Sequence, residues 1–179
     1  MIKPPKRLRK RPQWRGLPIP YIALIGIDGR PDFRVTDEQK RASVIRNRWC
    51  QLCGEPLGKW MFFTGGTEAA KANQYFEPGC HMDCLIYAMQ VCPFIVGRIE
   101  HAELDKVASS HPDMTVRADD TFSTKRNPLW IIKKATSFSL MKSNDGTILL
   151  YPHAVKETPA LKPEEMTATD WRQVEKFLL

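Results

Sequence analysis

The chain has no long apolar run, and this absence limits the classes of protein to which it can belong. No stretch of 18 apolar residues occurs among its 179 residues, so we expect no transmembrane helix. The charged N-terminus is not followed directly by an apolar stretch, which argues against a secretory signal. With 42% hydrophobic residues and no internal repeats, the sequence favours one domain with its own core.

The first 16 residues contain no acidic side chain. They hold seven of the 27 lysines and arginines, so the whole excess of positive charge, +7, lies there and residues 17–179 are neutral overall. Prolines 4, 5 and 12 predict a flexible, extended arm rather than a helix. Such an arm can neutralise nucleic-acid phosphates, or it can serve only as a solubilising terminus. Its cations are Lys3, Lys6, Arg7, Arg9, Lys10, Arg11 and Arg15.

The motifs of several enzyme classes are missing. No His-x-Glu element precedes the paired cysteines, as a zinc deaminase would require. Gly65-Gly66 is not followed by the Lys-Ser/Thr of a phosphate-binding loop. His101, His111 and His153 have no motif around them, and we interpret them as surface or loop residues. We therefore predict no catalytic residues, although the sequence leaves the question of an enzyme open.

Two short cysteine clusters carry the chemistry that is present. Cys50 and Cys53, two residues apart and followed by Gly54, have the spacing of a zinc knuckle. His81 and Cys84 are three apart in a predicted helix and share one face, so they can complete a tetrahedral site. We predict that Cys50, Cys53, His81 and Cys84 bind zinc, with Cys80 as the alternative ligand.

The cysteines allow two other interpretations. Buried free cysteines are common in cores, but a Cys-x-x-Cys-Gly together with a His/Cys cluster rarely arises from packing alone. A redox pair would need a βαβ context that is missing here. An odd number of cysteines with metal spacing also fits the reducing cytoplasm better than an oxidising compartment.

The order of predicted elements indicates an α+β fold. Three predicted elements precede the knuckle: a strand at 21–27, a second strand at 33–35, and a helix from Thr36 or Asp37 to about Asn47. After the knuckle we predict a strand at 59–63, which residues 64–67 end. A loop or short helix at 68–79 follows, and then a helix at 81–91. Beyond the cysteines we predict a helix at 101–110, a loop at 111–125, strands at 130–132, 138–141 and 148–151 with a turn at 143–146, and a closing helix at about 163–178.

Knuckle, β-hairpin and helix in this order predict a treble-clef-like zinc lobe, combined with a small antiparallel sheet and a C-terminal helix. We divide the chain into a flexible arm (1–16), a zinc-binding region (17–100) and a β-hairpin and helix region (101–179) packed on the zinc lobe as one unit. Treble-clef nucleases need a histidine in the hairpin to activate water, and residues 57–78 contain none.

The zinc segment resembles a group of small uncharacterised proteins from actinobacteria and their phages. The resemblance lies in residues 48–58, in the run 77–84 and in residues 88–94, and more loosely in 32–35, 127–130 and the C-terminal helix. In that group the second ligand pair is similar to His-x-x-Cys, which implies His81 and Cys84 rather than Cys80. The resemblance implies a phage or prophage setting and no known activity.

These observations leave two hypotheses of different classes. The first is a non-catalytic, zinc-stabilised protein that binds DNA or RNA, with the arm and the basic helix (Lys40 and Arg41) contacting phosphates. Trp49, Trp60, Phe62 and Tyr75 offer stacking surface, though core positions are the simpler interpretation. The second is an adaptor or inhibitor that acts on a host enzyme, and a divergent nuclease ranks third. We expect no membrane association.

Overall fold

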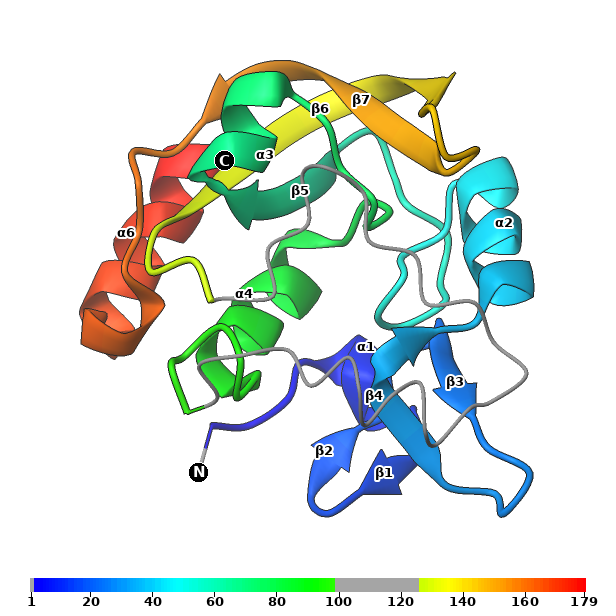
Figure 1. The fold of residues 1–179 in the computed structure, drawn as a ribbon. Helices are drawn as coiled ribbons and strands as arrows, with labels where there is room; N and C mark the ends of the chain where they lie inside the picture. The colour runs from blue at the N-terminus through cyan, green and yellow to red at the C-terminus, as the bar shows by residue number, and fades with distance from the viewer. Residues whose placement is uncertain (1, 99–125) are drawn as a thin grey trace.

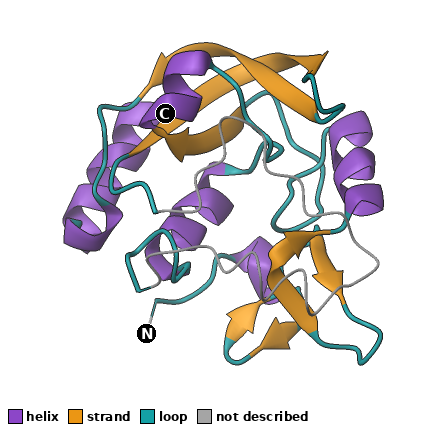
Figure 2. Ribbon diagram, in the orientation of Figure 1, coloured by secondary structure: helices purple, strands orange, loops and turns teal. Residues whose placement is uncertain are grey.

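The structure, a computed structural model, describes residues 2–98 and 126–179 and has a mixed α and β architecture, as predicted (Figures 1 and 2). Its strands are β1 (Gln13–Trp14), β2 (Leu17–Pro18), β3 (Ala23–Ile25), β4 (Pro31–Thr36), β5 (Met61–Gly66), β6 (Trp130–Lys142) and β7 (Ile148–Glu157). Its helices are α1 (Lys6–Arg9), α2 (Glu38–Asn47), α3 (Thr67–Ala72), α4 (Met82–Val91), the 3-10 turn η1 (Pro163–Glu165) and α6 (Ala168–Leu178).

The strands of the described residues form small antiparallel sheets. β1 pairs with β2, β3 pairs with β4, and β5, β6 and β7 form a sheet in that order. The last sheet joins two distant parts of the sequence, because β5 lies between the two cysteine clusters and β6 lies far beyond them. No helix within 2–98 or 126–179 has the length and apolarity that a bilayer span requires.

The helix boundaries follow local signals that the sequence carries. Asp37 caps α2 by accepting hydrogen bonds from the backbone N–H groups of Gln39 and Lys40, both at 3.1 Å. Thr167 and Asp170 form a reciprocal capping box at the start of α6. The predicted helices at 37–47, 81–91 and the C-terminus are therefore confirmed. The predicted helix at 101–110 and loop at 111–125 lie outside the described residues.

The prediction of separate strands at 130–132 and 138–141 was wrong, because β6 is a single strand with irregular register near Ala135. Lys133 and Lys134 are charged residues that suggest an interruption of the strand, but both side chains are buried and the strand continues through them. The Lys133 ammonium donates to the carbonyl of Ala70 at 2.8 Å, and that of Lys134 donates to the carbonyl of Leu178 at 2.6 Å. These partners satisfy the two charges inside the molecule.

One other predicted boundary was wrong, while the predicted loop or short helix at 68–79 is confirmed as a short helix, α3. The strand before the second cysteine cluster continues through Thr64–Gly66 instead of ending there, and helix α3 follows at once. The predicted hairpin turn at 143–146 is confirmed: the N–H of Ser143 donates to the carbonyl of Thr147 at 2.8 Å.

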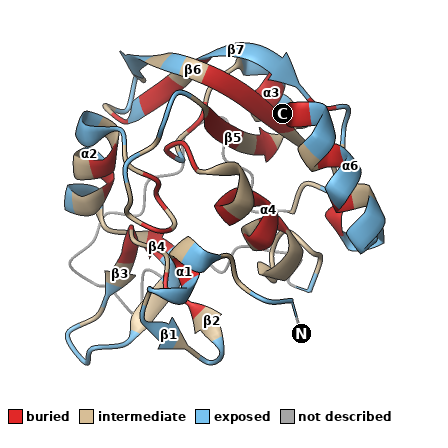
Figure 3. Cartoon of the chain, turned by 180° about the vertical axis from the view of Figure 1, so that it is seen from behind, coloured by how far each residue is buried: buried red, intermediate tan, exposed pale blue. Residues whose placement is uncertain are grey.

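Among the described residues, the core contains two apolar clusters. Figure 3 shows the buried segments in red. One lies around the cysteines and includes the buried faces of α4 and α6, Phe62 and Leu8. The other lies against the β5–β6–β7 sheet and consists of Met61, Phe63, Tyr75, Ala135 and Leu150. Of the four aromatic residues considered for stacking, Phe62 and Tyr75 are buried in these clusters.

Candidate metal centre

The first half of the centre is a tight turn that follows α2. Arg48 ends α2 in the left-handed conformation, and Trp49 and Pro56 form a bridge across the base of the turn. The N–H of Gly54 donates to the carbonyl of Cys50 at 2.8 Å. Gly54 itself has φ +78°, and a Cβ on it would lie 2.4 Å from the ring of Tyr21. Only glycine fits this position, so the glycine of the Cys-x-x-Cys-Gly sequence has a steric role.

The second half of the centre is the start of α4. Phe62 of β5 and Cys80 exchange two backbone hydrogen bonds, 2.9 and 3.0 Å long, which fixes the chain just before the helix. His81 is the N-cap residue of α4, and Cys84 lies in its first turn. β5 therefore positions the second ligand pair opposite the knuckle.

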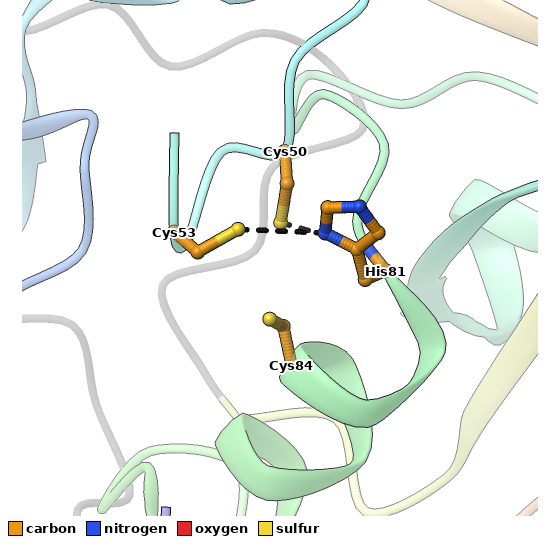
Figure 4. Close-up of side chains that lie close together, drawn as sticks. All are labelled: Cys50, Cys53, His81 and Cys84. Carbon is orange, nitrogen blue, oxygen red and sulfur yellow. Dashed lines mark hydrogen bonds between the residues drawn. The ribbon is translucent and has the colours of Figure 1, made fainter. Parts of the chain in front are cut away.

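The structure brings Cys50, Cys53, His81 and Cys84 together, as predicted (Figure 4). One ligand atom from each lies within 4.8 Å of all the others. A tetrahedral zinc site with Zn–S bonds of 2.3 Å has sulfur–sulfur edges of about 3.8 Å. The 3.4 Å distance between Cys53 Sγ and His81 Nδ1 matches the sulfur–nitrogen edge of such a site. The four residues can bind a metal ion with this geometry.

The hydrogen bonds around His81 determine which ring nitrogen is available. Nε2 lies 3.1 Å from the carbonyl oxygen of Pro56, which can only accept a hydrogen bond, so Nε2 carries a proton. This contact leaves Nδ1 to face Cys50 and Cys53 as the ligand atom. The carbonyl of Pro56 was not predicted, because nothing in the sequence marks one backbone carbonyl among many.

Cys80, the predicted alternative ligand, is not one of the four clustered residues. Its sulfur is buried and accepts a hydrogen bond from Nε2 of Gln51 at 3.4 Å, and the same amide donates to the carbonyl of Pro78 at 2.7 Å. Cys92 lies at the end of α4, partly buried. None of the five cysteines forms a disulfide.

The protonation of the cluster reflects the closeness of its members. Burial would raise the pKa of Cys50, but hydrogen bonds from Cys53, Cys80, Cys84 and His81 hold it well below its usual value. Hydrogen bonds to Cys50 and Cys53 are the main causes that raise the pKa of Cys84, and burial raises it further. Burial lowers the pKa of His81, but the hydrogen bonds to Cys50 and Cys53 outweigh it and raise this pKa to about 10. These shifts favour a thiolate at Cys50 beside protonated His81 and Cys84.

The N-terminal segment lies against this centre, so the prediction of an extended arm was wrong. Residues 6–9 form the helical turn α1, which fits between the prolines, and Leu8 is buried in the same apolar cluster as Cys50 and Cys53. Arg7 forms ion pairs with Glu55 at 3.4 Å and with Asp83 at 3.2 Å.

Two further basic residues of the segment also have partners in the folded chain. Lys10 pairs with Glu55 at 2.9 Å, and this hydrogen bond is the largest contribution to the lowered pKa of Glu55. Nε of Arg11 donates to the carbonyl of Ile19 at 3.0 Å, and its guanidinium lies 5.4 Å from the centre of the Tyr21 ring. The remaining predicted phosphate contacts of the segment, Lys3, Lys6, Arg9 and Arg15, are exposed.

The assignment of Arg41 to a phosphate-binding surface was wrong. Its side chain is only 4% exposed and donates to the carbonyls of Phe76, at 2.8 and 3.1 Å, and of Ile148, at 2.5 Å. Lys40 is half-buried, donates to the carbonyl of Ala23 at 3.0 Å and pairs with Asp37. The sequence could not reveal these roles, because the acceptors of Arg41 lie in distant segments.

Comparisons with known protein families, with curated proteins and with solved structures found no match for this chain.

Proposed function

We propose that the four-residue cluster binds zinc as a closed, structural site. Three cysteines and one histidine, with Nδ1 facing the sulfurs, form a ligand set that binds zinc in preference to hard cations such as magnesium. With four protein ligands, no coordination position remains for water or substrate, which is the arrangement of structural rather than catalytic zinc. The order of knuckle, Phe62–Cys80 pairing and α4 supports a treble-clef-like lobe as its frame.

We further propose that the protein is a non-catalytic nucleic-acid-binding protein of the phage or prophage type. The observation that carries this proposal is the anchoring of a basic segment on the zinc lobe. Leu8 and Arg7 fix α1 to the cluster, while Lys6 and Arg9 in the same turn are exposed. Fixed cations bind phosphates at a lower entropic cost than the same cations on a mobile tail. The phage setting rests on the sequence resemblance alone.

The charge of the proposed zinc site is complementary to the charge of this segment. Zinc with three thiolates and a neutral histidine carries one net negative charge, and Glu55 and Asp83 add two more beside it. Arg7 and Lys10 offset this charge. The exposed cations that do not pair with these acids, Lys3, Lys6, Arg9 and Arg15, are the ones we assign to phosphate contacts.

Fluorescence anisotropy of short labelled DNA and RNA against salt concentration tests this proposal. Replacing Lys6 and Arg9 with glutamate should weaken binding and reduce the slope of log K against log salt by about two, one for each lost phosphate contact. The matched control replaces Arg172 and Lys176, two exposed cations of α6, with glutamate and should keep the slope.

Two results would contradict nucleic-acid binding. One is no binding of either nucleic acid at low salt, and the other is an equal loss of affinity in both double variants. Either result would favour the second hypothesis, an adaptor or inhibitor that acts on a host enzyme. Magnesium-dependent cleavage of the labelled probes would instead establish a nuclease.

A further inference from the structure

Strand β6 extends well beyond its neighbour β5. β5 pairs with residues 130–135 only, the last pair being Met61 with Ala135. The other edge of β6 pairs with β7 as far as Lys142. In Figure 1 the β6–β7 hairpin projects past the end of β5. Within 2–98 and 126–179, no strand therefore pairs with residues 137–142 on the β5 side of β6.

The hydrogen-bond pattern shows which backbone groups face this open edge. Leu150 of β7 exchanges two hydrogen bonds, 2.8 and 2.9 Å long, with Tyr75 on the side away from β6. Leu150 lies opposite Leu140 of β6, and this pair therefore exchanges no backbone hydrogen bond. The N–H and C=O of Leu140 consequently point away from β7. The register is regular from Phe138 to Lys142, so the backbone groups of these two residues point the same way.

Two apolar side chains of this edge, Leu140 and Met141, are exposed on opposite faces of the sheet, whereas Phe138 packs against Phe63 in the second core cluster. Leu140 is 51% and Met141 53% exposed, and Phe138 is half-buried. A guanidinium nitrogen of Arg48 donates to the carbonyl of Thr136 at 2.8 Å, just before this run. Soluble proteins normally protect such an edge with proline, a bulge or several charges, and residues 138–142 have only Lys142.

We propose that a second copy of this chain pairs with this edge, so that the β6 strands of two molecules join antiparallel about a two-fold axis at Leu140. In this register Leu140 lies opposite Leu140 of the second copy, and Lys142 lies opposite Phe138. The one charge of the run therefore meets an aromatic ring rather than another lysine, and the two exposed leucines bury each other. This self-complementarity is the reason for choosing a second copy as the occupant. The inference does not depend on nucleic-acid binding.

Each copy carries a net charge of +7, so the two copies repel each other through the solvent. Added salt screens this repulsion and should strengthen the pairing. Nucleic-acid binding has the opposite dependence on salt. The two interactions are consequently distinguishable in one titration.

Sedimentation velocity of the full, zinc-loaded chain, from low micromolar to the highest attainable concentration, tests the proposal. We expect the mass to rise from 20.6 kDa toward twice that value, and more steeply at higher salt. Leu140→Lys places two lysines opposite each other and should weaken association at least about tenfold. The matched control Val155→Lys adds the same charge at a site on β7 that is 59% exposed, and it should leave association unchanged.

A mixing experiment makes the two-fold register falsifiable. Leu140→Lys and Leu140→Glu should each be monomeric alone and should form a mixed dimer when combined, because residue 140 meets its own counterpart. Far-UV circular dichroism and zinc content must match the parent, as expected for a half-exposed position. A parent chain that stays monomeric at every concentration, an equal effect of Val155→Lys, or no mixed dimer would overturn the proposal.

Discussion

Replacing Leu8 with alanine should release the N-terminal segment from the zinc lobe. Leu8 is 3% exposed and is the buried residue of α1, packed in the cluster that contains Cys50, Cys53 and Cys84. The ion pairs of Arg7 hold the segment far less, because the side chains of Arg7, Glu55 and Asp83 are between 36% and 43% exposed. Exposed pairs of this kind typically contribute less than about 1 kcal/mol.

The size of the effect follows from the burial of Leu8. Leucine-to-alanine changes in a core cost about 2–5 kcal/mol, and the lower value applies where the surroundings can relax. A terminal segment can relax readily, so we expect about 2 kcal/mol. This corresponds to about a thirtyfold increase in the population in which the segment is undocked.

Limited proteolysis with trypsin measures this population, since residues 3–15 provide seven lysines and arginines. When opening and closing are fast, the rate of cleavage follows the equilibrium population of the open form. Mass spectrometry of the cleaved termini should show a rate about thirty times that of the parent. Ile27→Ala, at a fully exposed apolar residue, is the control and should leave the rate unchanged. If the parent is cleaved as fast as a free peptide of residues 1–18, the segment is not docked and our reasoning is wrong.

Three further outcomes are expected. Cys50→Ser should release zinc and abolish the cooperative thermal transition of the zinc lobe, because structural zinc binding is folding free energy. Zinc must displace the protons that His81 and Cys84 hold at neutral pH, so zinc affinity should rise by at least about a hundredfold per pH unit between pH 6 and 8, measured by chelator competition. Arg41→Met should lower the free energy of unfolding by about 3 kcal/mol in urea titrations, because the carbonyls of Phe76 and Ile148 lose their donor.

Each of these predictions has a control in the same chain. Cys92→Ser should keep zinc, since Cys92 lies outside the cluster, and Arg46→Met changes an exposed arginine on the same helix as Arg41. Full zinc content in Cys50→Ser would contradict the proposed ligand set. A zinc affinity that does not change with pH would refute the assignment of protons to His81 and Cys84. Equal losses of stability in the two arginine variants would rule out a special role for Arg41.

The parts of the molecule that sequence reasoning predicted correctly depend on local signals. Asp37 caps α2 through its own neighbours, the turn at 143–146 contains Asp145-Gly146, and the ligand pairs are close in sequence. Each of these features is decided within a few residues of the chain.

The features that were missed depend on partners far away in the sequence. Lys133 and Arg41 are cations whose carbonyl acceptors lie dozens of residues away, so they resemble surface residues until the fold is known. Leu8 is a single apolar residue between charges, and one residue makes no periodic pattern. The prolines around α1 restrict their own positions and the residue before each of them, which leaves residues 6–9 able to form one helical turn.

The bridge between Phe62 and Cys80 has a consequence for the order of folding. A zinc ion bound by the four clustered residues would close a short loop, whereas β5, which lies inside that loop, must find its strand partner β6 much later in the chain. Loops of this length close quickly, and pairings distant in sequence form slowly. Zinc binding should therefore fix the conformation of β5 before β6 pairs with it. Without zinc, the step in which β6 pairs with β5 should be slower during refolding.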